Sequence, residues 1–219
     1  MIFMDNILRT NFGDDPNLGL YGFATEKICF IGFKPKNKLE SKTKDILKTK
    51  IEIISPLNMD YAGIFLSGNS SGIMAHEIIG EENEIKGDVL FLGGEHTALG
   101  NLILMNDSGI VISPLLKKQK SKIERFFGLR CETEKIIGSN VIGTLAFATN
   151  KGCLIHPKAK EKEIKIIEKA LNVAAHKGTV NFGSPFPGAG IIANSKGIIV
   201  SKASTGFELG AITEALGFI

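Results

Sequence analysis

The sequence has few cysteines, no long apolar segment and no basic leader. Cys29, Cys131 and Cys153 are odd in number and form no C-x-x-C pair. We therefore expect reduced core thiols and no structural zinc site. No apolar run approaches the roughly 18 residues of a membrane span. The start, MIFMDNILRTNFGDD, carries acids where a signal peptide needs a basic lead. These absences predict a soluble cytoplasmic protein without a membrane partner.

The overall composition is that of a globular protein. The chain has 219 residues, of which 43% are hydrophobic and 22% are charged. A chain of this length buries roughly 70% of its unfolded surface, so a hydrophobic core can form without disulfide bonds. Length alone suggests one or two domains.

Pairs of glycines nine residues apart recur along the chain. Four pairs are present: Gly63 and Gly72, Gly100 and Gly109, Gly143 and Gly152, Gly188 and Gly197. A fifth copy begins at Gly19 but carries Ile28 at the second position. The units start near residues 19, 63, 100, 143 and 188. Because five copies fill the chain, we expect one domain over residues 1–219.

Each unit repeats the same parts. Runs such as LILM at 102–105 and LAFA at 145–148 are apolar on consecutive positions, which is typical of strands buried on both faces. A turn with asparagine and glycine follows, because both residues tolerate left-handed backbone. After a second apolar strand, one position recurs four residues beyond the turn glycine. In chain order it holds Gly32, His76, Ser113, His156 and Ser201. Where this residue is His or Ser, we expect it to cap a helix.

A helix and a third strand complete each unit. The helices are expected at 36–50, 77–86, 115–127, around 164–171 and around 209–216. Third strands are expected at 51–54, 89–92 and 131–137. No third strand follows the last helix, so we expect residues 1–9, MIFMDNILR, to supply it. This N-terminal strand would close a ring and remove exposed sheet edges.

The predicted fold is α/β (α+β), a ring of five strand–strand–helix–strand units with the helices outside. Five such units describe the pentein fold, a five-fold pseudosymmetric α/β propeller. Several segments resemble the archaeal and eukaryotic translation initiation factor 6 family, and the resemblance covers the whole chain. They are ALGNLILMNDSG, NKGCLIHP, GTVNFGSPF, ANSKG and STGFELGAITEALGF. The length is similar to that of the archaeal form. The family usually carries arginine at Phe182, and proline and arginine at Phe207 and Ala211.

The resemblance implies a translation initiation factor that binds the large ribosomal subunit. Such a factor occupies the intersubunit face, on a ribosomal protein beside the sarcin–ricin loop, and sterically prevents association with the small subunit. A role in large-subunit maturation, a monomeric state and the absence of any cofactor, metal or catalytic site are implied as well. By resemblance, the ribosome-binding residues include Asn69 and Asn101, and Thr97, which lies just upstream of Asn101, is a further candidate. The alternative is that both asparagines only form turns.

Some pentein relatives are enzymes that act on guanidino groups. They need a cysteine, a histidine and carboxylates that converge on one centre. No cysteine lies in the last unit, where those relatives place the nucleophile, and no histidine has a carboxylate at their short spacing. The segment GTVNFGSPFPGAG matches no phosphate-binding motif. We therefore expect no enzyme. An amidino-group hydrolase or transferase with a diverged site, or a ring-shaped binding module for another partner, is the alternative.

Positive charge is concentrated in three helical segments. Residues 34–50 hold seven lysines against two acids, and residues 117–130 hold four lysines and two arginines against one acid. Residues 158–169 hold five lysines against three glutamates. These segments could be solvated helix faces, or they could face ribosomal RNA. No aromatic residues are interleaved with the lysines, so an RNA contact would use phosphates and shape rather than base stacking.

Overall fold

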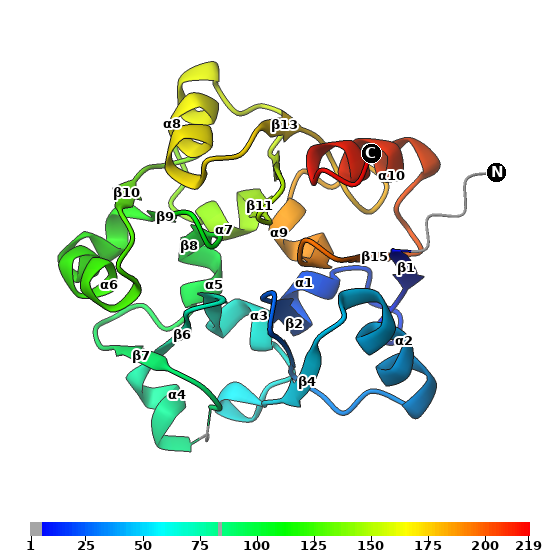
Figure 1. Ribbon diagram of the computed structural model, residues 1–219, viewed down its shortest axis with the longest axis horizontal. Helices are drawn as coiled ribbons and strands as arrows, with labels where there is room; N and C mark the ends of the chain where they lie inside the picture. Colours follow the sequence, from blue (N-terminus) through cyan, green and yellow to red (C-terminus); the bar gives the residue numbers. More distant parts are fainter. Residues whose placement is uncertain (1–5, 83–84) are drawn as a thin grey trace.

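The computed structural model describes residues 6–82 and 85–219. Five three-stranded sheets surround a central axis, as Figure 1 shows. In the four sheets that are continuous in sequence, the first two strands are antiparallel and the third is parallel to the middle one. The fifth sheet has the order β1-β15-β14. This arrangement confirms the predicted five-fold fold class.

Each sheet is built from short strands. Their bounds are β1 Ile7–Thr10, β2 Gly22–Ala24, β3 Ile28–Ile31, β4 Lys50–Ile53, β5 Ser67–Asn69, β6 Gly72–His76, β7 Val89–Leu92, β8 Ile103–Met105, β9 Ile110–Ile112, β10 Cys131–Thr133, β11 Ala146–Ala148, β12 Cys153–Ile155, β13 Ala175–Lys177, β14 Ile191–Ala193 and β15 Ile198–Ser201. Five outer helices lie at the periphery in Figure 1: α2 Asn37–Leu47, α4 Glu77–Glu82, α6 Lys120–Phe127, α8 Glu161–Leu171 and α10 Gly206–Ala215.

One-turn helices lie around the axis. They are α1 Leu18–Tyr21, α3 Ala62–Phe65, α5 Leu99–Leu102, α7 Ile142–Leu145 and α9 Pro187–Gly190. Two 3-10 helices, η1 Pro56–Asn58 and η2 Pro114–Gln119, complete the elements. Across the described residues, no helix is both long and apolar enough to span a membrane.

The N-terminal strand completes the fifth sheet. β1 pairs in parallel with β15, from Ile7 opposite Ile198 to Thr10 opposite Ser201. It therefore takes the place that β4 or β7 has in its own sheet, which confirms the expected closing strand. Of the predicted segment 1–9, residues 1–5 lie outside the described residues, and the strand extends one residue further, to Thr10.

The core lies between neighbouring sheets. Ile192 and Ile199 of the fifth sheet pack with Cys29 and Ile31 of the first. Four similar clusters join the other neighbours in turn. Every residue of β9, β12 and β15 is buried as a result. This packing explains why the middle strands are apolar on consecutive positions rather than alternating.

A ring of five glycines surrounds the axis. Each one-turn helix contributes one, in the order Gly19, Gly63, Gly100, Gly143 and Gly188. A Cβ atom added to any of them would lie 1.8–2.1 Å from the carbonyl oxygen of the preceding glycine in the ring. Gly19 meets Gly188 in the same way, so the contacts run round a closed circle. The glycines thus permit a backbone approach that no other residue allows.

The one-turn helices were not predicted. Their residues read as the beginning of apolar strands, because a short apolar run does not distinguish a strand from a buried helical turn. The predicted helix 36–50 is also too long, since Lys48 takes left-handed backbone and Lys50 begins β4. The predicted strand 131–137 ends at Thr133, and a turn follows in which Ile136 bridges Ser139.

Candidate functional site

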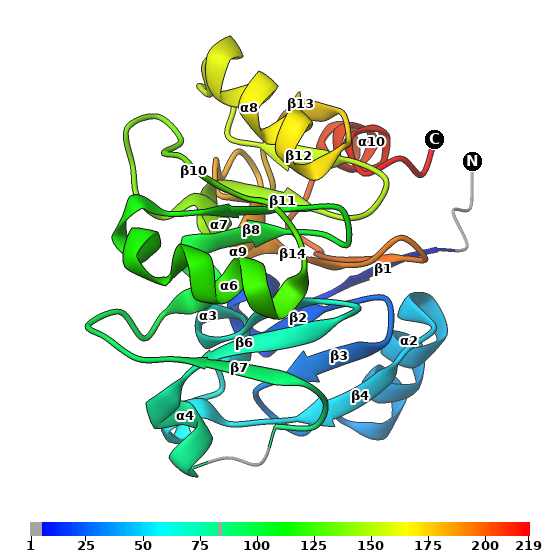
Figure 2. The same cartoon turned by 60° about the vertical axis from the view of Figure 1, so that its left-hand side comes forward.

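The ring has two different ends along its axis. At one end lie the glycine ring and the loops that lead into the one-turn helices; we call this the helix end. At the other lie the turns that join the first two strands of each sheet; we call this the turn end. Figure 2 shows the loops between β7 and α5 and between β10 and α7 protruding on the side of the one-turn helices.

Two of the three predicted contact residues lie at the helix end. The carbonyl of Thr97 accepts a hydrogen bond from the Leu99 amide at 2.9 Å, at the start of α5. Asn101 follows the ring glycine Gly100, and its Oδ1 accepts from the Thr144 hydroxyl at 3.1 Å. Both residues are half-buried. They are held in place and still present part of their surface to solvent.

Asn69 lies at the turn end and is 5% exposed. Its Nδ2 donates to the Asn106 carbonyl at 3.1 Å, and its Oδ1 accepts from the Ser71 amide at 2.8 Å. Asn106 and Asn194 order their own turns in the same way. The structure therefore does not bring Asn69 together with Thr97 and Asn101.

Hydrogen bonds between polar side chains join the turns at the turn end. The Ser70 hydroxyl donates to Asp107 at 2.7 Å, and Asn150 Nδ2 donates to the same carboxylate at 2.7 Å. The Ser195 hydroxyl donates to Glu26 at 2.7 Å. These side chains of the turn end therefore bond to one another across neighbouring units.

The helix end is more apolar. Three of the loops that lead into one-turn helices expose large apolar side chains, which are Met59, Ile137, Val141, Phe182 and Phe186. Single exposed apolar residues are common on proteins, and the five at this end make the helix end a candidate contact surface.

A hollow of about 700 Å³ lies beside Thr97. It separates the loop after β7 from η2, and its lining includes His96 and Leu116. Two contacts fix that loop: Gln119 Nε2 donates to the Gly93 carbonyl at 2.9 Å, and His76 Nε2 donates to the Gly94 carbonyl at 2.9 Å. The hollow is therefore a preformed feature of the helix end.

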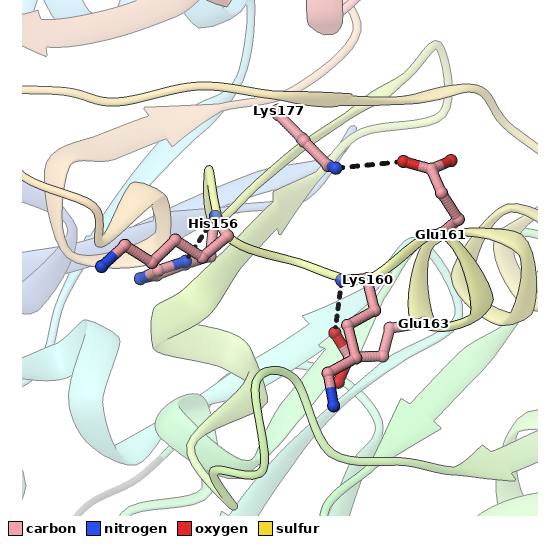
Figure 3. Close-up of polar contacts among 6 residues, drawn as sticks. His156, Lys160, Glu161, Glu163 and Lys177 are labelled. Carbon is pink, nitrogen blue, oxygen red and sulfur yellow. Dashed lines mark hydrogen bonds and ion pairs between the residues drawn. The ribbon is translucent and has the colours of Figure 1, made fainter.

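The predicted helix cap is confirmed for Ser113, which is the N-cap of η2, but it is wrong for His156 and Ser201. Their side chains cap the turn after the second strand, and the helices α8 and α10 begin later, with Lys160 and Thr205 as N-caps. In each of the four units, the side chain accepts a hydrogen bond from the amide two residues later, at 2.9–3.3 Å. For His156, shown in Figure 3, Nδ1 accepts from the Lys158 amide at 3.0 Å. Burial and the positive charge of Lys158 lower the pKa of His156. The ring is thus held neutral in a structural role.

The three cysteines are poor nucleophiles. Burial raises the pKa of the Cys29, Cys131 and Cys153 thiols to about 12. Only the thiolate reacts, so these side chains are inert at neutral pH. Within residues 6–82 and 85–219, no three His, Cys, Asp or Glu side chains gather in a way that could hold a metal ion.

The sequence profile of the eIF-6 family matches residues 7–215. The chain belongs to the eIF-6 family. It is 33% identical to translation initiation factor 6 of Methanocaldococcus jannaschii over 228 residues, covering 99% of this chain and 100% of that protein. It is 32% identical to the protein of the same name from Thermococcus onnurineus over 226 residues, covering 98% and 99% of the two chains.

Membership of the eIF-6 family confirms the resemblance drawn from the sequence. The relatives are named as translation initiation factors and not as enzymes, which confirms the expectation that the chain is not an enzyme. The inert thiols agree with this. The amidino-group hydrolase or transferase is therefore not retained as a function of this eIF-6 family member.

Two buried carboxylates at the helix end were missed. Glu208, which is 4% exposed, accepts from the Phe182 and Gly183 amides at 3.1 and 2.8 Å. Glu163 accepts from the Ile137 amide at 3.0 Å and from the Lys160 amide at 2.8 Å, the latter drawn in Figure 3. A local signal existed for Glu208, because Thr205-x-x-Glu208 is a helix capping box. Nothing local pointed to the contacts with the loops.

Proposed function

We propose that this protein binds the large ribosomal subunit on its intersubunit face and prevents association with the small subunit. The bulk of the ring excludes the small subunit, so no cofactor or chemical step is needed. The protein acts in the cytoplasm as a monomer and as a single domain over residues 1–219. Its partner is a ribosomal protein near the sarcin–ricin loop, and a role in maturation of the large subunit follows from binding there.

The helix end is the docking end in this proposal. Thr97 and Asn101 contact the subunit directly, whereas Asn69 acts through the turn that it orders. The observation that supports this choice is the difference between the ends. Apolar side chains are exposed on the loops of the helix end, and the polar side chains of the turn end bond to one another. A protein interface requires apolar surface at its centre, and the helix end provides it.

The basic outer segments would approach ribosomal RNA from the side. A hollow of about 570 Å³ between the end of α2 and β4 is lined by four lysines, which are Lys27, Lys44, Lys48 and Lys50. Such a cluster attracts phosphates over a distance set by the ionic strength. Its contribution to binding is steering, while the helix end supplies the specific contact.

Co-sedimentation with separated ribosomal subunits tests the proposal. The protein is expected to pellet with large subunits and to reduce joining of small subunits. Asn101→Lys should weaken this binding by about 2–4 kcal/mol, because it would bury an unpaired charge in the interface. Ser108→Lys introduces the same charge at the exposed turn end, outside the turn that Asn69 orders, and should bind like the wild type. Failure of the wild type to pellet, or equal binding by Asn101→Lys, would refute the assignment.

A further inference from the structure

Two loops at the helix end hold an apolar residue in left-handed backbone. Ile137 has φ 51° and is 38% exposed, and Phe182 has φ 62° and is 83% exposed. Residues with a Cβ atom avoid this region, and β-branched residues such as isoleucine avoid it most. Glycine or asparagine would fit either place better. The local backbone conformation therefore does not explain why isoleucine and phenylalanine occupy these two positions.

The surrounding structure imposes this backbone. The buried carboxylate of Glu163 binds the Ile137 amide at 3.0 Å, and that of Glu208 binds the Phe182 amide at 3.1 Å. In both loops a glycine with positive φ follows, Gly138 or Gly183. Each loop is thus fixed by a glutamate in the first turn of the next outer helix.

Neither side chain contributes to the core. Ile137 and Phe182 belong to none of the five buried clusters or to the apolar residues packed against them. Leu57 provides a contrast. It also has left-handed backbone, with φ 54°, but it packs against the cluster between the first two sheets. The side chain of Leu57 therefore contributes to the packing of the fold, whereas those of Ile137 and Phe182 do not.

A third exposed apolar side chain is next in sequence to a residue that contacts the Phe182 loop. Phe207 is 88% exposed and directly precedes Glu208, whose carboxylate binds the Phe182 amide. The segments beside these two residues carry no charge, neither in GTVNFGSPFP at 178–187 nor in ASTGF at 203–207. A nucleic-acid contact needs lysine or arginine to meet the phosphates. This uncharged surface instead fits an apolar patch on a protein.

We propose that Ile137, Phe182 and Phe207 are the apolar anchors of the docking surface, and that they insert into an apolar patch of a large-subunit protein. This inference rests on the proposed function and adds the chemistry of the partner. The strained backbone of each loop points the apolar side chain outward, where the partner protein can contact it. Backbone strain that buried groups maintain is a recurring feature of binding sites.

Asparagine substitutions separate this role from a structural one. Ile137→Asn and Phe182→Asn should raise the midpoint of thermal unfolding, because asparagine accepts left-handed backbone. The same variants should bind purified large subunits at least about tenfold more weakly, as expected for anchor residues. Phe207→Ala should weaken binding to a similar degree. Higher stability combined with weaker binding is a result that a structural role cannot produce.

Gly210→Ala is the control for stability. A Cβ atom at Gly210 in α10 would meet nothing within 4 Å, so alanine stabilises the protein without changing the three anchor side chains. This variant should be more stable and should bind within about twofold of the wild type. Equal loss of binding by Gly210→Ala and Phe182→Asn would overturn the proposal, because stabilisation alone would then explain both.

The remaining outcomes identify the partner. For an apolar protein contact, the loss of affinity in Phe182→Asn is the same at low and high salt. A change in the salt dependence of binding would indicate RNA and overturn the proposal.

The wild-type protein alone provides a second test. If it dimerises with increasing concentration and Phe182→Asn abolishes the dimer, the surface binds a second copy of this chain and the proposal is overturned. If the wild type binds and the three anchor variants bind equally well, the anchors are wrong while the proposed function stands. If the wild type does not bind, both fail.

Discussion

Gly19 meets Gly188 at the point where the first and last units close the ring. A Cβ atom added to Gly19 would lie 2.1 Å from the Gly188 carbonyl oxygen. The same contact occurs between every pair of neighbouring units, so the central packing is one interaction made five times. None of the five ring glycines can therefore be replaced by alanine without moving the backbone of a neighbouring unit.

The first prediction concerns this glycine ring. Gly100→Ala should lower the free energy of unfolding by about 3 kcal/mol, as overpacking does when the neighbours cannot move. The neighbours here are backbone atoms, since a Cβ atom on Gly100 would lie 2.0 Å from the Gly63 carbonyl oxygen and 2.8 Å from that of Leu66. Denaturation in urea measures the change.

Gly210→Ala is the control for that substitution. Gly210 lies inside α10, and a Cβ atom there would meet nothing within 4 Å. Alanine should therefore stabilise the protein by about 0.5–1 kcal/mol, because it removes the entropic penalty of glycine in a helix. A loss of stability at Gly210 that equals the loss at Gly100 would show that the ring is not the cause.

Local patterns predicted the repeated parts well. The asparagine–glycine turns and the residues that cap after them, such as Ser113 and His156, depend on contacts two or three residues away. The closing strand β1 was predicted by counting, because third strands were recognised in three units and no residues remained after the last helix to supply one. These features needed no knowledge of the tertiary structure. The third strand of the fourth unit, β13, was missed, because Ala175–Lys177 is too short and polar to stand out.

The loops of the helix end depend on distant residues and could not be predicted. The left-handed backbone at Ile137 and Phe182 follows from hydrogen bonds to glutamates 26 residues later in the chain. By contrast, the repeat pattern carries information on the contact residues that were chosen by resemblance. It puts Asn69 in the turn after a first strand and Asn101 just before a first strand, so the two asparagines are expected at opposite ends of the ring.

The second prediction is that Glu208→Gln destabilises the protein in a pH-dependent way. Burial opposes the charge of Glu208, but hydrogen bonds from Thr205, Gly183 and Thr179 outweigh it and lower the pKa. At pH 7 the substitution should reduce the free energy of unfolding by about 2–3 kcal/mol. Because the folded pKa is the lower one, this stabilisation is complete above the unfolded pKa of about 4.3 and is lost as the pH falls through the folded pKa.

Denaturation at pH 7 and at pH 3.5 checks this, since the gap between wild type and Glu208→Gln should narrow in acid. Glu161→Gln serves as the comparison. Glu161 is exposed and pairs with Lys177 at 3.0 Å, so its replacement should change stability by less than about 1 kcal/mol. A gap for Glu208→Gln that is constant with pH would contradict the role of the charge.

The third prediction concerns the end of α2. Lys48→Asn should stabilise the protein by about 1 kcal/mol, because a lysine here occupies left-handed backbone with φ 51°. Other units use better residues at this place, Gly128 after α6 and Asn172 after α8. Thermal unfolding of the variant measures the gain. An unchanged midpoint would mean that other interactions of Lys48 offset the cost of its left-handed backbone.

The last prediction uses the neutral cap of His156. Serine occupies the equivalent position in two other units, so a serine in His156→Ser should still accept the hydrogen bond from the amide two residues later. The variant loses the packing of the imidazole ring and should therefore be less stable than the wild type at pH 8. In the wild type, burial lowers the folded pKa of His156. The unfolded chain therefore takes up a proton first, near pH 6.5, and the stability of the wild type falls as the pH drops below that value. The variant lacks this loss, so the difference in unfolding free energy should be smaller at pH 5 than at pH 8. An equal difference at both pH values would show that His156 does not contribute to the acid sensitivity.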